Sequence, residues 1–384
     1  MSEWKKVKLG EICDRVTSGG TPKSGVNSYY NPPKYPWLRT KEVNYCRIYD
    51  TEQHISQEGL NHSSAKLIPE NSVIIAMYGQ GDTAGRVAIN KVPLTTNQAC
   101  CNLIINSEKA DFEFIYFNLC TLYQKLVSLK NGGAQPNLSA KIIKDLDICL
   151  PDLDTQHKIA SFLSRYDSLI DNYQRQIKLL EEAAQRLYKE WFVDLHFPGY
   201  ENTKIVDGVP EGWRKGTLSS ISEFRRGKTI TKKEIKEGTV PVVAGGLTPA
   251  YYTNTSNTGN RVITISASGA NAGYTRLYYQ NIWASDCSFV DASMTKYLYY
   301  VYCFLKVNKS LIDNLQKGAA QPHVYPKDIN ALEIIIPSQK ILDSTEEILS
   351  SMFEEISQID AQIHLLIEAR DRLLPKLMSG EIEV

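Results

Sequence analysis

Two stretches of this chain repeat one another without a gap at a separation of 186 residues. The segment GAQPNLSAKIIKDLDICLP begins at Gly133, and AAQPHVYPKDINALEIIIP begins at Ala319. The same separation continues further on, where IKLLEEAAQRL from Ile177 aligns with IHLLIEARDRL from Ile363. A repeat of this length predicts that the fold consists of two copies of one unit.

Weaker matches extend the repeat toward the start of each copy. WKKVKLGEI from Trp4 matches WRKGTLSSI from Trp213, and SVIIAMYGQGDTAG from Ser72 parallels RVITISASGANAG from Arg261. The chain therefore reads as domain, helix, domain, helix.

The two helices are predicted by apolar residues that alternate spacings of three and four, the heptad pattern of a coiled coil. Neither Pro nor Gly interrupts residues 155–193. We expect the first helix to start near Asp154 as N-cap and to end before Pro198, and Pro375 to end or kink the second helix. The positions expected to form the helix–helix seam are Leu163, Tyr166, Ile170, Tyr173, Ile177, Leu180, Ala184, Leu187, Leu349, Met352, Ile356, Ile359, Ile363, Leu366 and Leu373.

Short β-branched runs bounded by Gly-rich turns predict strands in both domains, and longer aromatic runs predict helices. The expected strands are Val73–Ala76, Val262–Ile265, Asp147–Leu150 and Glu333–Ile336, and the expected helices are Phe112–Leu129 and Lys296–Leu315. The expected divisions are a first domain at 1–152, a helix at 153–195, a linker at 196–212, a second domain at 213–340, and a helix with a tail at 341–384.

The connectivity predicts how the elements combine. The first helix leads from domain one to domain two, and the second must return because its seam needs a partner. The predicted fold is therefore α+β: two mixed α/β domains separated by two long antiparallel coiled-coil helices, with a pseudo-twofold internal repeat. A pseudo-twofold arrangement suits two DNA half-sites at a fixed separation.

The charge distribution also favours DNA, although the net charge of the chain is zero. Residues 200–340 hold 17 Lys and Arg against 11 Asp and Glu, a net charge of +6, whereas residues 341–384 are net −7. The eight cysteines form no C-x-x-C pair or zinc-like cluster, which is typical of free thiols in the cytoplasm. No apolar stretch approaches the length of a membrane span, and no export signal is evident.

Candidate DNA contacts fall into a phosphate class and a base-edge class. The basic run FRRGKTITKKEIK could line a phosphate track, or form a solvated loop; its cations are Arg225, Arg226, Lys228, Lys232 and Lys233. Glycine-rich loops at matching places in the two copies could approach base edges, or form tight turns; their candidates are Gln80, Asp82, Thr83, Arg86, Asn271 and Arg276.

Other candidates carry a stronger structural alternative. The pairs Asn97-Gln98 and Ser285-Asp286 could read bases, but a turn role is favoured. In the repeated turn, Gln135 and Gln321 are interpreted as structural, and Asn137 and His323 as possible DNA contacts. In the loop SYYNPPKYPWLRT, Trp37 is expected in the core, and Arg39 and Lys41 are candidate contacts.

Catalytic chemistry is not indicated. Asn31-Pro32-Pro33-Lys34 lacks the aromatic fourth residue of the adenine methyltransferase motif, and no glycine-rich methyl-donor motif precedes it. GQGDTAG lacks the G-K-[ST] of a nucleotide loop. The six histidines are isolated, so we expect no catalytic residue and no metal site.

The sequence resembles the specificity subunits of type I restriction-modification systems over essentially its whole length. The resemblance is carried by KEWFVDLHFPGYENTKIVDGVPEGWRKGTL, by RDRLLPKLMSGEI and by the repeated AQPNLS/AQPHVY turn. It implies two target-recognition domains and two spacer helices, which together read a bipartite double-stranded DNA site. It implies no base-reading residue, because the recognition domains vary most in this family.

The resemblance also implies partners. Two adenine-methyltransferase subunits are expected, and usually ATP-driven restriction/translocase subunits, with S-adenosylmethionine, ATP and Mg²⁺ bound by the partners and no cofactor by this chain. The alternatives are a methyltransferase-only system without a translocase, a self-contained DNA adenine methyltransferase, and a purely structural coiled-coil protein. The absent donor motif argues against the second, and the aromatic-rich domains argue against the third.

Overall fold

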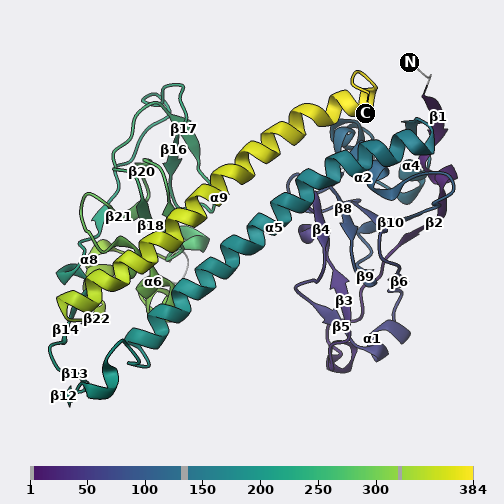
Figure 1. Cartoon of the computed structure of the whole chain (residues 1–384). Coiled ribbons are helices and arrows are strands. Elements are labelled where there is room, and N and C mark those ends of the chain that lie inside the picture. Colours follow the sequence, from purple (N-terminus) through teal and green to yellow (C-terminus); the bar gives the residue numbers. More distant parts are fainter. Residues whose placement is uncertain (1–3, 131–136, 319–321, 384) are drawn as a thin grey trace. The chain divides into compact units, whose positions relative to one another are not determined.

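The computed structural model describes residues 4–130, 137–318 and 322–383, which form two compact units. Unit 1 comprises Met1–Asp171 with His364–Val384, and unit 2 comprises Asn172–Ile363. Helix α5 (Leu153–Phe192) begins in unit 1 and ends in unit 2, whereas helix α9 (Gln339–Ser379) begins in unit 2 and ends in unit 1 (Figure 1). The predicted mixed α/β domains and two long helices are therefore confirmed.

Unit 1 is built on two sheets and a strand pair. The first sheet has the order β2 (Cys13–Ser18), β10 (Cys100–Ile105), β7 (Val73–Ala76), β8 (Val87–Asn90), β4 (Cys46–Ile48). The second has the order β5 (His54–Ile55), β3 (Tyr35–Leu38), β9 (Leu94–Thr96), β6 (Leu67–Ile68), with β3 parallel to β9. The pair is β1 (Lys5–Lys8) with β11 (Asp147–Leu150), and the short helices are α1 (Gln57–Asn61), α2 (Phe112–Thr121), α3 (Tyr123–Ser128) and α4 (Ala140–Lys144).

Unit 2 repeats this plan. Its first sheet has the order β15 (Arg225–Arg226), β21 (Cys287–Asp291), β18 (Val262–Ser266), β19 (Thr275–Tyr278). Its second has the order β17 (Tyr251–Thr253), β16 (Val240–Val243), β20 (Trp283–Ala284), with β16 parallel to β20. The remaining elements are the strand pairs β14 (Arg214–Thr217) with β22 (Glu333–Ile336) and β12 (Ile205–Val206) with β13 (Val209–Pro210), and the helices α6 (Leu298–Val307), α7 (Lys309–Asp313) and α8 (Pro326–Asn330).

The repeat is preserved down to strand register. In unit 1, Lys5 pairs with Leu150, and in unit 2 the equivalent Arg214 pairs with Ile336. The expected strands β7, β18, β11 and β22 are confirmed, while each expected aromatic helix is divided in two, α2 with α3 and α6 with α7. The first division follows a non-helical Leu122, with φ −91° and ψ 10°.

Each long helix buries more than the predicted seam. In unit 2, Phe353 of α9 stacks on Tyr299 of α6 with ring centroids 4.8 Å apart, and Tyr188 of α5 lies 5.3 Å from the ring of Tyr300. The seam positions themselves are buried or half-buried, and none is fully exposed. A second apolar face on both helices, turned toward the domain, thus packs in the core of unit 2.

Two details of the helix ends differ from expectation. Residue Asp152, not Asp154, caps α5, because its Oδ1 accepts a hydrogen bond from Thr155 N at 2.9 Å. Helix α9 passes through Pro375 and continues to Ser379. Leu377 and Met378 are buried in the core of unit 1, and this packing outweighs the hydrogen bond that the proline removes.

Candidate nucleic-acid interface

The segments that carry most of the predicted base contacts converge in each unit through equivalent backbone hydrogen bonds. They are the hairpin loop of the first sheet, the polar pair that follows β9 or β20, the residues after the repeated turn, and the end of β2 or β15. Eight backbone hydrogen bonds form four matched pairs, one bond of each pair in each unit. In unit 1 they are Met77 N to Ala99 O (2.8 Å), Gly20 N to Thr96 O (2.9 Å), Asn97 N to Leu38 O (2.9 Å) and Leu138 N to Met77 O (3.0 Å). In unit 2 their counterparts, in the same order, are Ala267 N to Asp286 O (3.2 Å), Lys228 N to Ala284 O (2.9 Å), Ser285 N to Val243 O (2.8 Å) and Val324 N to Ala267 O (3.0 Å). Both units thus assemble the same surface from the same four segments.

The hairpin loops need their last glycine. Gly85, between β7 and β8, has φ +95°, and Gly273, between β18 and β19, has φ +85°. Their nitrogens bond Ala76 O and Ser266 O, at 2.8 and 2.9 Å. Residues other than glycine rarely adopt a positive φ, so a glycine is needed at this place in both turns. The tips of both loops are exposed to solvent.

In unit 2, Asp286 connects Arg226 and Ser268 in a network of polar side chains. It forms an ion pair with Arg226 at 2.5 Å and accepts a hydrogen bond from Ser268 Oγ. Ser285 beside it is buried, so of this predicted pair only Asp286 reaches the surface. His323 joins the same surface through β-bridges to Ser268 and Lys317.

The cationic residues of the basic run lie on the surface of unit 2, whereas Phe224 at its start is buried. Arg225, Arg226, Lys228, Lys232 and Lys233 all have exposed side chains. Arg226 is compensated by Asp286, and Lys232 Nζ lies 5.8 Å from the ring centroid of Tyr251. The run enters the site because Gly227 packs against the backbone of Ala284 and Ser285, where a Cβ would lie 2.4 Å from Ser285 O.

Asn271 and Arg276, two other predicted DNA contacts of unit 2, donate hydrogen bonds to the backbone of a neighbouring loop. Asn271 Nδ2 donates to Gly245 O at 3.4 Å, and Arg276 Nη1 donates to Leu247 O at 3.0 Å. The Arg276 guanidinium also lies 4.8 Å from the ring centroid of Tyr278. Both side chains therefore fix the loop that follows β16, for which no sequence pattern predicted a role.

In unit 1, the hairpin loop contains its own ion pair. Arg86 bonds Asp82 at 2.6 Å and Asn44 Oδ1 at 2.8 Å, and the Arg86 contact lowers the pKa of Asp82. Thr83 Oγ1 donates to Gln80 O at 2.7 Å, which closes the turn. The side chain of Gln80 remains exposed at the tip.

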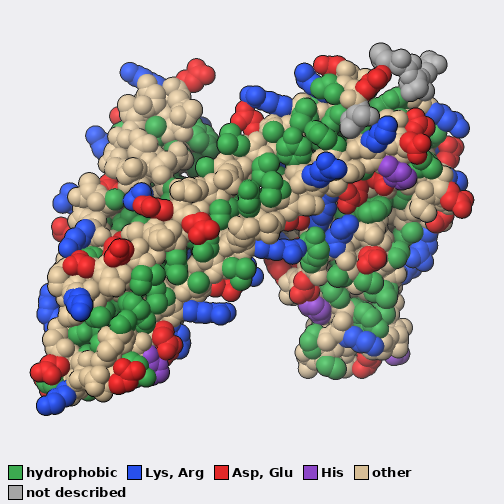
Figure 2. Space-filling model, in the orientation of Figure 1, with side chains coloured by type: hydrophobic (Ala, Val, Ile, Leu, Met, Phe, Trp, Pro, Cys, Tyr) green, Lys and Arg blue, Asp and Glu red, His purple; other side chains and the backbone are tan. Residues whose placement is uncertain are grey.

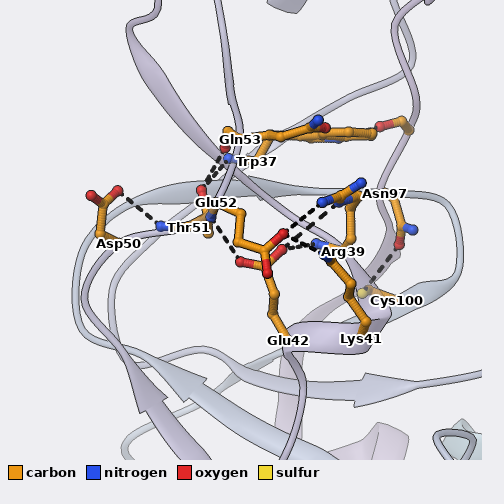
Figure 3. Close-up of polar contacts among 11 residues, drawn as sticks. Trp37, Arg39, Lys41, Glu42, Asp50, Thr51, Glu52, Gln53, Asn97 and Cys100 are labelled. Carbon is orange, nitrogen blue, oxygen red and sulfur yellow. Dashed lines mark hydrogen bonds and ion pairs between the residues drawn. The ribbon is translucent and has the colours of Figure 1, made fainter. Parts of the chain in front are cut away.

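Arg39 and Lys41 share a cluster with two carboxylates (Figure 3). Glu52 accepts a hydrogen bond from Arg39 Nη2 at 2.8 Å and pairs with Lys41, whose contact lowers the pKa of Glu52. Glu42 connects the segment after β3 with the segment before β5, because its carboxylate accepts hydrogen bonds from Arg39 N at 3.2 Å and Glu52 N at 2.9 Å. About half of the Glu52 and Lys41 side chains is exposed, so the cluster presents donors and an acceptor together.

The remaining candidates of unit 1 divide between turn and surface. Asn97 Oδ1 accepts from Ala99 N at 3.2 Å, the predicted turn role, whereas Gln98 is exposed and bonded to Thr21. Asn137 is exposed. Gln135 and Gln321 lie outside the described residues. Trp37 is buried as expected and donates from Nε1 to Gly20 O at 3.0 Å.

Neither a metal site nor a membrane span is found in the described part of the chain. Within residues 4–130, 137–318 and 322–383, no group of three His, Cys, Asp or Glu side chains could hold a metal ion. Of the helices that the structure describes, none is both long and apolar enough to cross a membrane.

The comparisons with known proteins agree with the repeat. A family model described as "Type I restriction modification DNA specificity domain" matches residues 1–182 and 210–369. The chain is 29% identical over 414 residues to the type I restriction enzyme MjaIX specificity subunit of Methanocaldococcus jannaschii, covering all of this chain and 94% of that protein. It is 23% identical to the HindI specificity subunit of Haemophilus influenzae, with both chains fully covered.

A solved structure shares the fold. The S subunit of a type I restriction-modification system from M. genitalium superposes with a TM-score of 0.62 at 19% identity, covering 97% of this chain and 96% of that one.

Proposed function

This chain belongs to the type I restriction-modification DNA specificity family, and from that premise we propose that each unit reads one half of a bipartite double-stranded DNA site. The observation that carries the proposal is the matched set of backbone hydrogen bonds that builds one surface twice. The surface has the same scaffold in both units but different side chains, such as the Arg39–Glu52 cluster in unit 1 and the Arg226–Asp286 pair in unit 2. Two copies of one scaffold with different side chains suit two different half-sites.

We further propose that the chain itself is not catalytic and that its partners perform the chemistry. Two adenine-methyltransferase subunits would bind S-adenosylmethionine, and restriction/translocase subunits, where the system has them, would bind ATP and Mg²⁺. A methyltransferase-only system remains the alternative assembly. Such a complex would act in the cytoplasm, where the cell's DNA is.

A duplicated, exposed helix stripe supports two copies of one partner. Along the long helices, identical exposed or half-exposed residues recur at the repeat distance of 186: Gln176 with Gln362, Leu179 with Leu365, Glu182 with Glu368, and Arg186 with Arg372. The two leucines are 64% and 66% exposed, the highest values among the large hydrophobics that the structure describes. Figure 2 shows hydrophobic side chains reaching the surface along the C-terminal part of α9.

Packing within the chain does not bury the two leucines of this stripe, whereas its Glu and Arg side chains pair along each helix, Arg186 with Glu182 at 3.8 Å and Arg372 with Glu368 at 2.5 Å. Other exposed positions of the two helices differ between the copies, such as Leu169 and Glu355, or Lys178 and His364. The identical exposed leucines on both helices therefore favour one partner surface bound twice, by apolar contact at the leucine.

Methylome sequencing tests the proposed function. Cells that express this chain with its methyltransferase should carry methyladenine in one bipartite motif. Exchanging residues 213–336 for the matching segment of a relative should change only one half of that motif. A motif that changes in both halves, or methyl transfer by the purified chain alone, would contradict the proposal.

A further inference from the structure

The loop that follows β16 carries an exposed leucine on a rigid backbone. Gly245 O accepts hydrogen bonds from Ser266 Oγ at 3.2 Å and Asn271 Nδ2 at 3.4 Å, and Leu247 O accepts one from Arg276 Nη1 at 3.0 Å. Leu247 is 51% exposed. Isolated exposed leucines are common on protein surfaces, but here three side chains hold the backbone of the loop that carries the leucine.

Gly245 brings this loop into the candidate DNA surface. A Cβ on Gly245 would lie 2.9 Å from Ser268 O and 3.6 Å from Asp286 Oδ2, so the loop packs directly against the Arg226–Asp286 network. Leu247 is therefore two residues from Gly245, which packs against Asp286, and Asp286 pairs with Arg226 of the basic run, a cation suited to phosphates.

The same place in unit 1 has the opposite chemistry. Strand β3 pairs in parallel with β9 as β16 pairs with β20, so the turn after β3 is equivalent to the loop after β16. In unit 1 this turn carries Arg39, Lys41 and Glu42 (Figure 3). One position of the fold is thus charged in one unit and apolar in the other.

Base edges offer few apolar groups to such a side chain. In the major groove, the 5-methyl group of thymine is the one apolar feature that distinguishes a base pair, while the other features are hydrogen-bond donors and acceptors. Resting on the proposed function, we propose that Leu247 contacts the 5-methyl group of a thymine in the half-site that unit 2 reads. Asn271 and Arg276 then act as positioning residues for this contact.

Replacing thymine with deoxyuridine tests the contact, because it removes only the methyl group. The chain in complex with its methyltransferase is titrated with duplexes that carry the methylome-derived site, in which each thymine of one half-site is replaced in turn. Burial of one methyl group contributes about 0.8 kcal/mol, so we expect about fourfold weaker binding at one position of the unit 2 half-site. Leu247→Ala should bind the thymine duplex about as weakly and should no longer distinguish thymine from deoxyuridine.

Matched controls separate this contact from general effects. Ile205→Ala removes another exposed side chain of unit 2, 59% exposed on β12, and should leave the discrimination unchanged. Arg276→Met should reduce the discrimination without changing the salt dependence of binding, whereas removing an arginine bound to phosphate would lower the salt slope by about one.

The outcomes are distinguishable from failure of the proposed function. A unit 2 half-site without thymine, binding that no deoxyuridine weakens, or a Leu247→Ala protein that still discriminates would overturn the thymine contact alone. A complex without a bipartite site would overturn the proposed function instead.

Discussion

Glu346 on α9 accepts a hydrogen bond from the backbone N–H of Tyr300 in the first turn of α6, with oxygen and nitrogen 2.9 Å apart. Its second oxygen accepts from Tyr299 N at 3.0 Å. In unit 1, Gln156 on α5 plays the corresponding part, because its Oε1 accepts from Asp111 N, just before α2, at 3.0 Å. Both long helices therefore hold an aromatic helix of their unit through a buried polar side chain, one acidic and one neutral.

This difference predicts a pH dependence for unit 2. Burial raises the pKa of Glu346 to about 7 from its ordinary value of 4.5, against the lowering effect of the two N–H donors. The folded state then holds a proton that the unfolded state releases, so stability falls as pH rises from about 4.5 to about 7. The urea concentration at the unfolding midpoint should therefore decrease over this pH range, and it should decrease less in Glu346→Gln. A Glu346→Gln protein with the same pH dependence as the unsubstituted chain would contradict the prediction.

Elements set by neighbouring residues can be predicted from the sequence, whereas elements set by contacts between residues far apart in the chain cannot. Local and repeated patterns predict strands β11 and β22 to the residue, because the repeated segment and the proline that follows each strand set their bounds. Pro375 does not end α9, one of the two predicted outcomes, because Leu377 and Met378 beyond it pack in the core of unit 1.

The candidate site is less predictable because its partners are distant in sequence. Arg39 meets Glu52 only after β3 and β5 pair, and Arg226 meets Asp286 across 60 residues. No sequence pattern singles out Leu247, and only the fold shows that it is exposed.

The basic run of unit 2 predicts a salt effect. Replacing Arg225 and Lys228 with Ala should weaken binding equally for specific and nonspecific DNA, and should lower the slope of log K against log salt by about one for each phosphate that is no longer bound. Arg226→Ala should change the slope less, because Asp286 already compensates that charge. An unchanged slope in the double variant would mean that the phosphates bind elsewhere.

The duplicated stripe predicts a stepwise reduction in bound partners. Leu179→Asp or Leu365→Asp should each reduce the complex to one methyltransferase copy, and the double variant should bind none, because a carboxylate would be buried at each interface. Native mass spectrometry counts the copies. Leu169→Asp is the control, since Leu169 is 38% exposed on the same helix and its counterpart is Glu355. If the double variant still assembles fully, the stripe is not the docking surface.

A buried ion network in unit 1 gives the last prediction. Asp167 of α5 binds Arg47 of β4 at 2.5 Å and Arg370 of α9 at 2.7 Å, and the side chains of Asp167 and Arg47 are only 7% and 5% exposed. This one carboxylate therefore links the first sheet to both long helices. Asp167→Asn removes the carboxylate that pairs with Arg47 at 2.5 Å and leaves the buried guanidinium with the more distant Glu113, 3.6 Å away. Removing one partner of a buried pair typically costs about 3–5 kcal/mol, because the remaining charge stays desolvated.

We expect Asp167→Asn to lower the free energy of unfolding of unit 1 by about 3 kcal/mol, since asparagine keeps one acceptor oxygen. Hydrogen exchange of the β4 and β8 amides in urea reports on this unit separately from unit 2. Glu381→Gln is the matched control, because it breaks the exposed Lys376–Glu381 pair, 3.5 Å apart in the same unit, and should cost less than about 1 kcal/mol. Equal effects of the two substitutions would show that the Asp167 network adds no more to stability than a surface ion pair.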